Sequence, residues 1–209
     1  MMNIIAKDNR IHEPIIDTER LILRPLTQAD AAVVQFLAGD KAIASTTLSI
    51  PHPYSVGVAQ KWIKSVKGDI AEGRSVVFAI TENENGNLLG TISLMINKEH
   101  NHAKMGYWIG RDYWGKGYCT EAAVAVLEYG FENLGLNRIF AQHFKGNDAS
   151  GAVMQKMGMN YEGSSKGYIK KWDQYKDIEN YGLVREDYRR GEQSYRLTGM
   201  PFPERYSFI

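Results

Sequence analysis

The segment from residue 103 to residue 134 constrains the fold of this chain more than any other part of the sequence. Residues 103–109 are typical of a strand, the next ten residues contain three glycines, and residues 120–134 place apolar side chains along one face of a helix. A strand, a glycine-rich loop and a helix in this order belong to a layered fold in which helices cover a sheet. The loop also brings backbone N–H groups to the start of a helix, where proteins commonly bind anions.

Further strand and helix patterns lie on both sides of this segment. Thr27 to Asp30 resembles a capping box that begins a helix, and Asn85-Gly86 predicts a hairpin turn between two strands. We expect the other strands at residues 18–26, 75–81, 88–96, 138–143, 168–172 and 177–184, and the other helices at residues 27–37, 55–73 and 147–157. This order predicts an α/β (α+β) fold with a mixed sheet.

Composition supports one globular domain and excludes several classes of protein. The 209 residues are 44% hydrophobic and 23% charged, which excludes a disordered or fibrous chain. The net charge of +1 provides no broad positive field, so we expect no direct nucleic-acid binding. The single cysteine, Cys119, excludes a disulfide framework and an all-cysteine metal site.

No repeat or linker marks an interior boundary. We therefore expect one domain over residues 1–187 and a C-terminal extension over residues 188–209 that packs on the domain or on a neighbouring subunit.

The sequence shows no signal for secretion or for membrane insertion. Residues 1–7 lack the apolar core of a signal peptide, and no apolar run reaches the roughly 18 residues of a membrane span. We expect a cytoplasmic protein with no membrane partner, either a monomer or a homodimer.

Three phosphate-binding interpretations compete for the loop at residues 110–122. A Walker A loop fits until Gly117, which has no hydroxyl to ligate magnesium. A dinucleotide fingerprint would need glycine or alanine where Thr120 stands, and an acidic residue near Asn137. A pyrophosphate bound by successive backbone N–H groups at a helix N-terminus needs neither, and the spacing of Gly115 and Gly117 satisfies it.

Several motifs in sequence order resemble the GNAT superfamily of acetyl-CoA-dependent N-acetyltransferases, and within it the RimJ/RimL-like branch. They are residues 18–24 (TERLILR), 51–54 (PHPY), 106–109 (GYWI) and 114–122 (WGKGYCTEA), together with Asn147-x-x-Ser150 and Gly158. The resemblance covers about residues 18–187. It implies a GNAT-like fold, with a mostly antiparallel central sheet, a splayed central strand pair and helices on both faces.

The resemblance also implies how acetyl-CoA would bind, with no metal. The backbone of the strand before the loop would contact the pantetheine arm and the thioester, the loop would hold the pyrophosphate, and Asn147 would contact pantetheine. The implied residues are Tyr107, Trp108, Ile109, Trp114, Gly115, Lys116, Gly117, Tyr118, Cys119, Thr120, Asn147 and Ser150. Trp114 stands where the superfamily usually has Gln or Arg, and Cys119 where it has Gly or Ala.

The catalytic residues that the resemblance implies are Ser150 and Glu99. Ser150 would protonate the leaving thiolate, although Asn147 and Ser150 are also typical helix caps. A tyrosine that many superfamily members place seven residues after this asparagine is absent, because Met154 stands there. Glu99 would be the general base, with His100, His102, Glu121 and His143 as alternatives in sequence. We interpret His100 and His102 as solvated loop residues and not as metal ligands.

The acceptor pocket would include His52, Tyr54, Trp172 and Tyr175. The predicted function is transfer of an acetyl group from acetyl-CoA to a primary amine by direct attack in a ternary complex. The amine would be a protein N-terminal Ser, Ala or Thr, or a small molecule. A non-catalytic acyl-CoA-binding module is the alternative, and a nucleotide hydrolase that uses the near-Walker loop is a third class.

Overall fold

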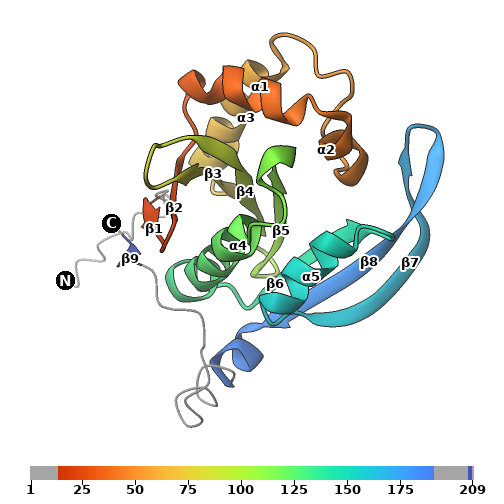
Figure 1. Cartoon of the computed structure of the whole chain (residues 1–209). Coiled ribbons are helices and arrows are strands. Elements are labelled where there is room, and N and C mark those ends of the chain that lie inside the picture. The colour runs from red at the N-terminus through yellow and green to blue at the C-terminus, as the bar shows by residue number, and fades with distance from the viewer. Residues whose placement is uncertain (1–13, 191–206, 209) are drawn as a thin grey trace.

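A computed structural model describes residues 14–190 and 207–208 of the chain (Figure 1). The strands are β1 (Ile16–Asp17), β2 (Leu21–Pro25), β3 (Ser75–Glu82), β4 (Leu88–Asn97), β5 (His102–Ile109), β6 (Arg138–Phe144), β7 (Asn160–Lys171), β8 (Gln174–Val184) and β9 (Ser207–Phe208). The helices are η1 (Gln28–Asp30), α1 (Ala31–Ala38), α2 (Lys41–Thr46), α3 (Val58–Ala71), η2 (Arg111–Tyr113), α4 (Tyr118–Glu128), η3 (Tyr129–Asn133) and α5 (Asp148–Lys156).

The described strands form one nine-stranded sheet in the order β7-β8-β6-β5-β4-β3-β2-β1-β9. Every neighbouring pair is antiparallel except β5 and β6, which are parallel. This confirms the predicted mixed α/β (α+β) sheet. The β3–β4 hairpin also forms as Asn85-Gly86 predicts, with Gly86 at φ 72°.

Helices cover both faces of the sheet, as predicted. One apolar cluster joins α4 and α5 to the sheet through residues such as Ala122, Val126 and Met154. A second cluster joins α1 and α3 to the opposite face through Val34 and Ile63. Strand β3 lies between the two clusters, and all but its last residue are buried. Its residues 76–80 are all apolar because both faces of the strand are covered.

The sequence prediction misses one helix and shortens one strand. Helix α2 occupies a stretch for which we expected no element, and β7 begins at Asn160 instead of residue 168. The expected strand at residues 18–26 is observed as β1 and β2, and the expected helix at residues 120–134 as α4 followed by the π-helical turn η3.

The predicted extension at residues 188–209 is only partly within the described residues. Residues 185–190 are helical, and Tyr188 is buried with its ring stacked on Phe131, the ring centroids 4.9 Å apart. At the other end, β9 pairs with β1 at the edge of the sheet. The domain boundary at residue 187 stays a prediction.

Candidate active site

Strands β5 and β6 pair for only part of their length. Their parallel register runs from His102↔Arg138 to Met105↔Ala141 and then stops, whereas β5 stays paired with β4 as far as Ile109. The predicted splayed strand pair is therefore confirmed. The opening between the two strands, which we call the strand gap, lies beside residues 107–109 of β5.

Two backbone N–H groups of β5 point into the strand gap. Gly110 N–H donates to Leu89 O at 2.8 Å, so Gly90↔Ile109 is a non-hydrogen-bonded antiparallel pair. The N–H groups of Ile109 and, two residues earlier, Tyr107 therefore point away from β4. A donor in this position can stabilise negative charge that develops on a carbonyl oxygen in the gap.

The glycine loop presents a row of backbone donors at the start of α4. Among the described residues, none of the backbone N–H groups from Gly115 to Thr120 has a hydrogen-bond acceptor. Gly115 and Gly117 have φ angles of 74° and 83°, and a Cβ at Gly115 would meet no atom within 4 Å. This open, donor-rich loop can accept a pyrophosphate group.

Arg20, near the N-terminal end of the described residues, contacts this loop through its side chain. Its guanidinium donates to Lys116 O at 2.9 Å and to Glu121 Oε2 at 2.8 Å, and lies 4.8 Å from the ring centroid of Tyr118. Glu121 also accepts from Thr18 Oγ1 at 2.6 Å. Arg20 binds the loop through the Lys116 carbonyl and leaves the backbone N–H groups of residues 115–120 unpaired among the described residues. Glu121 is therefore a structural residue and not a base.

The two departures from the superfamily pattern have structural explanations. Trp114 donates from Nε1 to Ile109 O at 2.6 Å, which ties the loop to the end of β5. Cys119 packs against the core beneath α4, and burial raises the pKa of its thiol to about 12. The thiol is therefore protonated at neutral pH.

Ser150 and Tyr107 meet across the strand gap. Tyr107 Oη lies 3.0 Å from Ser150 Oγ and 3.1 Å from Ser150 O. Burial raises the pKa of Tyr107 well above its usual value, so its hydroxyl stays protonated. Asn147 caps α5, with Oδ1 accepting from Ser150 N–H at 3.4 Å, which is the capping role that the sequence left open. The Nδ2 amide group of Asn147 has no hydrogen-bond acceptor within the described part of the chain.

The structure does not bring Glu99 to this site. Glu99 is exposed in the turn before β5, whereas the strand gap lies at the other end of that strand. The five to seven residue steps of β5 from His102 to the strand gap, at about 3.3 Å each, separate the two by roughly 17–23 Å. Glu99 lies next to the central strand, as the sequence indicates, but at the end away from the strand gap, so this geometry does not support Glu99 as the general base.

The histidines are also distributed differently from the expectation. His100 is an exposed loop residue, but His102 is half-buried against Phe140 and its Nδ1 has no partner among the described residues. His143 is buried: its Nδ1 lies 2.9 Å from Phe144 O, and its Nε2 lies under Gly151 of α5.

The predicted acceptor residues come together only in part. His52 and Trp172 face each other, with ring centroids 6.4 Å apart, so the loop after α2 meets the tip of the β7–β8 hairpin. Lys171 reinforces this contact by donating to Leu48 O and Ile50 O at 3.0 and 2.9 Å. Tyr54 packs instead against the cluster of α1 and α3, and the side chain of Tyr175 is 72% exposed on the hairpin.

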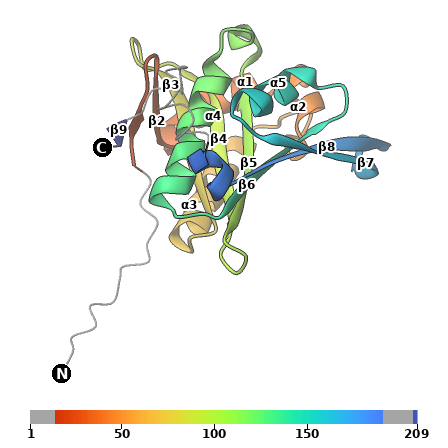
Figure 2. The ribbon, with the colours of Figure 1, turned by 90° about the horizontal axis from the view of Figure 1, so that it is seen from below.

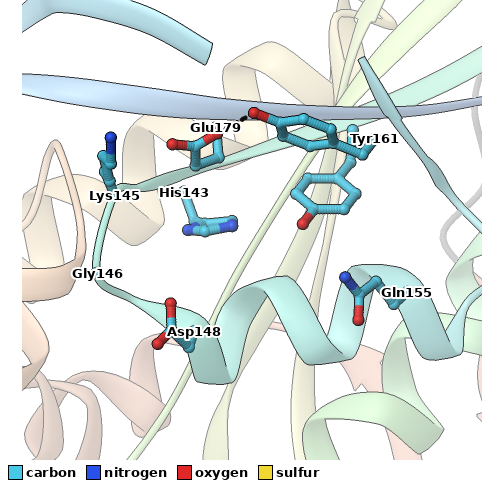
Figure 3. A pocket seen from close by; sticks show the side chains of 8 residues that line it. His143, Lys145, Gly146, Asp148, Gln155, Tyr161 and Glu179 are labelled. Carbon is cyan, nitrogen blue, oxygen red and sulfur yellow. Dashed lines mark hydrogen bonds between the residues drawn. The ribbon is translucent and has the colours of Figure 1, made fainter. Parts of the chain in front are cut away.

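A cavity of about 450 Å³ lies elsewhere, over β6, β7 and β8 (Figure 3). Its wall includes Asp148 and Gln155 of α5. At 100° per residue, Asp148 and Ser150 point about 160° apart on this helix. The cavity is therefore on the far side of α5 from the strand gap.

The sequence interpretation missed two functional groups. It assigned only backbone roles to Tyr107, whose hydroxyl meets Ser150, and it used Arg20 only as part of a motif. The alternation of strand side chains would have placed Tyr107 on the same face as its apolar neighbours Met105 and Ile109, but no sequence signal pairs it with Ser150.

Comparisons with known proteins agree with this geometry. Residues 20–160 match the acetyltransferase (GNAT) domain family. The uncharacterized N-acetyltransferase YoaA of Bacillus subtilis is 31% identical over 82% of this chain and 97% of its own. The spermidine N(1)-acetyltransferase of Escherichia coli is 29% identical over 68% of this chain and 73% of its own.

Solved structures share the fold. RimL, a ribosomal L7/L12 α-N-protein acetyltransferase in complex with coenzyme A, superimposes with a TM-score of 0.76 at 18% identity, over 82% of this chain and 98% of its own. Within the described residues, no helix is long and apolar enough to cross a membrane. The matched domain covers most of the chain and contains the strand gap and the glycine loop, and the chain therefore belongs to the GNAT family of acetyl-CoA-dependent N-acetyltransferases.

Proposed function

We propose that this enzyme transfers the acetyl group of acetyl-CoA directly to a primary amine in a ternary complex, the amine being a protein N-terminal Ser, Ala or Thr or a small molecule. The observation that carries this proposal is the strand gap, which has unpaired N–H groups on β5, the loop donors at one end and the Ser150 hydroxyl across from them. The names of RimL and of the spermidine acetyltransferase support the two acceptor classes.

The donor would bind along the strand gap. The loop N–H groups would hold its pyrophosphate beside the Lys116 ammonium, and the free side-chain amide of Asn147 would bond the pantetheine arm. The same assignment includes Tyr107, Trp108 and Ile109 on β5 and Trp114 to Thr120 in the loop. Of these, Trp114 acts through its bond to Ile109 O.

Ile109 and Ser150 would carry the chemistry. The amine nitrogen attacks the thioester carbonyl carbon, and the N–H of Ile109 stabilises the oxyanion, a contribution of a few kcal/mol. As the carbon–sulfur bond breaks, Ser150 Oγ donates its proton to the sulfur. Tyr107 then donates to Ser150 Oγ from the other side, because its raised pKa keeps it protonated. The nitrogen releases its surplus proton to solvent, and Ser150 Oγ takes a proton back from solvent, which restores its hydroxyl for the next turnover.

Replacing Ser150 tests this assignment. In Ser150→Ala, kcat should fall about 100-fold while the Kd of CoA stays within a few-fold, because the hydroxyl acts on the leaving sulfur. Tyr107→Phe should lower kcat about tenfold, since Ser150 keeps its own proton. Thiol release from acetyl-CoA gives kcat, and calorimetry gives the Kd.

Ser65→Ala is the matched control, because Ser65 lies exposed on α3 and bonds only to Trp62 O. Its kcat should equal that of the wild type. Unchanged turnover in Ser150→Ala would leave Ser150 as a part of the α5 cap and would remove it from the reaction.

A further inference from the structure

A small cavity on the face of the sheet opposite α5 contains one unpaired cation. The cavity has a volume of about 50 Å³ and lies between the segment after α2, strands β5 and β6, and the β7–β8 hairpin. Its lining residues are Thr46, Leu48, Lys104, Gln142, His143, Phe144, Ile169 and Ile178. Lys104 is the only charged side chain in this wall apart from the titratable His143.

Lys104 has no counter-ion among residues 14–190. Among the described residues, no carboxylate forms an ion pair with Lys104 and no acceptor bonds its ammonium. Loss of solvent lowers its pKa, which shows that the charged form is poorly hydrated here. A partly buried charge without a partner is costly, and ionisable groups with perturbed pKa values in a cavity are candidates for functional sites.

The other polar groups of the wall are already engaged. Gln142 Nε2 donates to Asn180 Oδ1 at 2.7 Å, and Thr46 Oγ1 donates to backbone carbonyls within α2. His143 Nδ1 faces Phe144 O, and its Nε2, which has no partner among the described residues, lies under Gly151 on the α5 side of the sheet. The Lys104 ammonium is therefore the donor that remains for a ligand, and its natural partner is a carboxylate.

The surrounding segments hold the cavity in a fixed shape. Lys171 is only 8% exposed and donates to the carbonyls of Leu48 and Ile50, which fastens the hairpin to the segment after α2. This contact borders the His52–Trp172 pair assigned to the acceptor. The cavity therefore lies on the side of the sheet where we expect the acceptor. The Lys171 ammonium is already bonded to backbone carbonyls, so it is not available to a ligand.

We propose that Lys104 binds a carboxylate of the acceptor, so that the substrate is a peptide-like amine carrying a carboxylate two or three residues from the reacting nitrogen. This inference rests on the proposed function. The Cα atoms of Lys104 and Tyr107, three residues apart on β5, lie about 10 Å from each other along the strand that borders the strand gap. An extended tripeptide places its terminal carboxylate at about that distance from its amine. A polyamine would instead bring a cation to Lys104.

Matched acceptors test the proposal. Purified full-length enzyme and acetyl-CoA are combined with the peptide Ser-Ala-Ala, with the same peptide amidated at its C-terminus, or with spermidine. We expect kcat/KM to be at least tenfold higher for the free acid than for the amide, and this difference to shrink with added salt. Spermidine should be the poorest acceptor.

Variants at Lys104 connect the preference to this side chain. Lys104→Met should lower kcat/KM for the acid to that for the amide and leave the amide value within threefold. Lys104→Glu should make the amide the better acceptor. Lys170→Met is the control, because Lys170 is exposed on the same hairpin and pairs with Asp173; it should keep the full preference for the acid.

The outcomes separate this inference from the proposed function. If the wild type acetylates acid and amide equally, or if Lys104→Met keeps the preference, the carboxylate site is overturned while the acetyltransferase assignment stands. If CoA binds but no amine is acetylated, the proposed function itself fails. Lys104→Gln, which keeps the polar stem, replaces Lys104→Met if that variant does not show the CoA-dependent thermal shift of the wild type.

Discussion

Trp172 adopts a backbone conformation that tryptophan rarely takes. Trp172 and Asp173 have φ angles of 48° and 62° and form the two-residue turn of the β7–β8 hairpin. Glycine or asparagine normally fills such a turn, and holding another residue there costs about 1–3 kcal/mol. The indole at the hairpin tip lies near His52, a residue predicted to line the acceptor pocket, and this position suggests a test of whether the indole serves binding and not stability.

Replacing Trp172 by glycine should separate strain from function. In Trp172→Gly, we expect a melting temperature equal to or above that of the wild type, because glycine accepts the turn freely. KM for the acceptor should rise about tenfold, because the wall facing His52 is lost. Thermal melts and steady-state kinetics measure the two effects. Asp173→Gly relaxes the same turn and keeps the indole, so its KM should not change. A normal KM in Trp172→Gly would remove the indole from the acceptor site.

At the scale of elements, the first helical segment depends on one buried carboxylate. Asp30 accepts from Thr27 N–H at 2.8 Å and from both terminal nitrogens of Arg24 at 2.9 and 2.7 Å. Burial raises the pKa of Asp30, but the bonds from Arg24 and Thr27 together outweigh burial and lower the pKa overall. The ionised carboxylate thus joins β2 to the start of η1, as the capping box predicted from the sequence requires.

Asp30→Asn should destabilise the fold in a pH-dependent way. At pH 7 we expect a loss of about 1–3 kcal/mol in the free energy of unfolding, because a charge-assisted pair is broken inside the protein. The pKa of Asp30 is lower in the folded state, so its contribution is present above the ordinary value of 3.8 and is lost as the pH falls through the folded value. The urea midpoints of the wild type and of Asp30→Asn should therefore differ at pH 7 and converge as the pH falls below 4. Asp69→Asn breaks only an exposed pair with Arg74 and should stay within about 0.5 kcal/mol of the wild type.

The sequence predicts a helix or strand well where apolar residues follow a single period, and poorly where glycines or a short length interrupt that period. Strands β2 to β6 and helices α3 and α5 follow their patterns to within a few residues. Strand β7 is missed over its first half because Gly163 and Gly167, with φ angles of 118° and 57°, interrupt it with bulges. Helix α2 has only six residues, too few to show a helical period.

The candidate site divides in the same way. The loop N–H groups and the Asn147 cap follow from local sequence, because glycines and a helix start determine them. The contacts between Tyr107 and Ser150, and between Arg20 and the loop, join residues 43 and 96 positions apart. Only the tertiary fold determines such contacts. The distance of Glu99 from the strand gap could not be predicted for the same reason, since closeness in sequence to a strand does not say which end of the strand borders the gap.

At the scale of the whole molecule, distant parts of the chain combine to form the site at the glycine loop. Arg20, which immediately precedes β2, reaches the loop. Helices α4 and α5 lie side by side on one face of the sheet, and the β7–β8 hairpin extends at the end of the sheet away from β1 (Figures 1 and 2). The row of N–H groups exists only when these elements are packed. Coenzyme A should thus bind the folded state alone and stabilise it by mass action.

Coenzyme A at about 100 times its Kd should stabilise the fold by about 2.7 kcal/mol, which for a domain of this size raises the melting temperature by about 5–10 °C. Gly117→Val should abolish this shift, because a side chain at φ 83° strains the loop and its Cβ would lie 3.3 Å from the Arg20 guanidinium. Gly158→Val is the control matched in strain: Gly158 has φ 81° at the end of α5 opposite to Asn147 and an open space around its Cα. Both variants should melt earlier than the wild type, but only Gly158→Val should keep the shift with coenzyme A. A full shift in Gly117→Val would place the pyrophosphate away from the glycine loop.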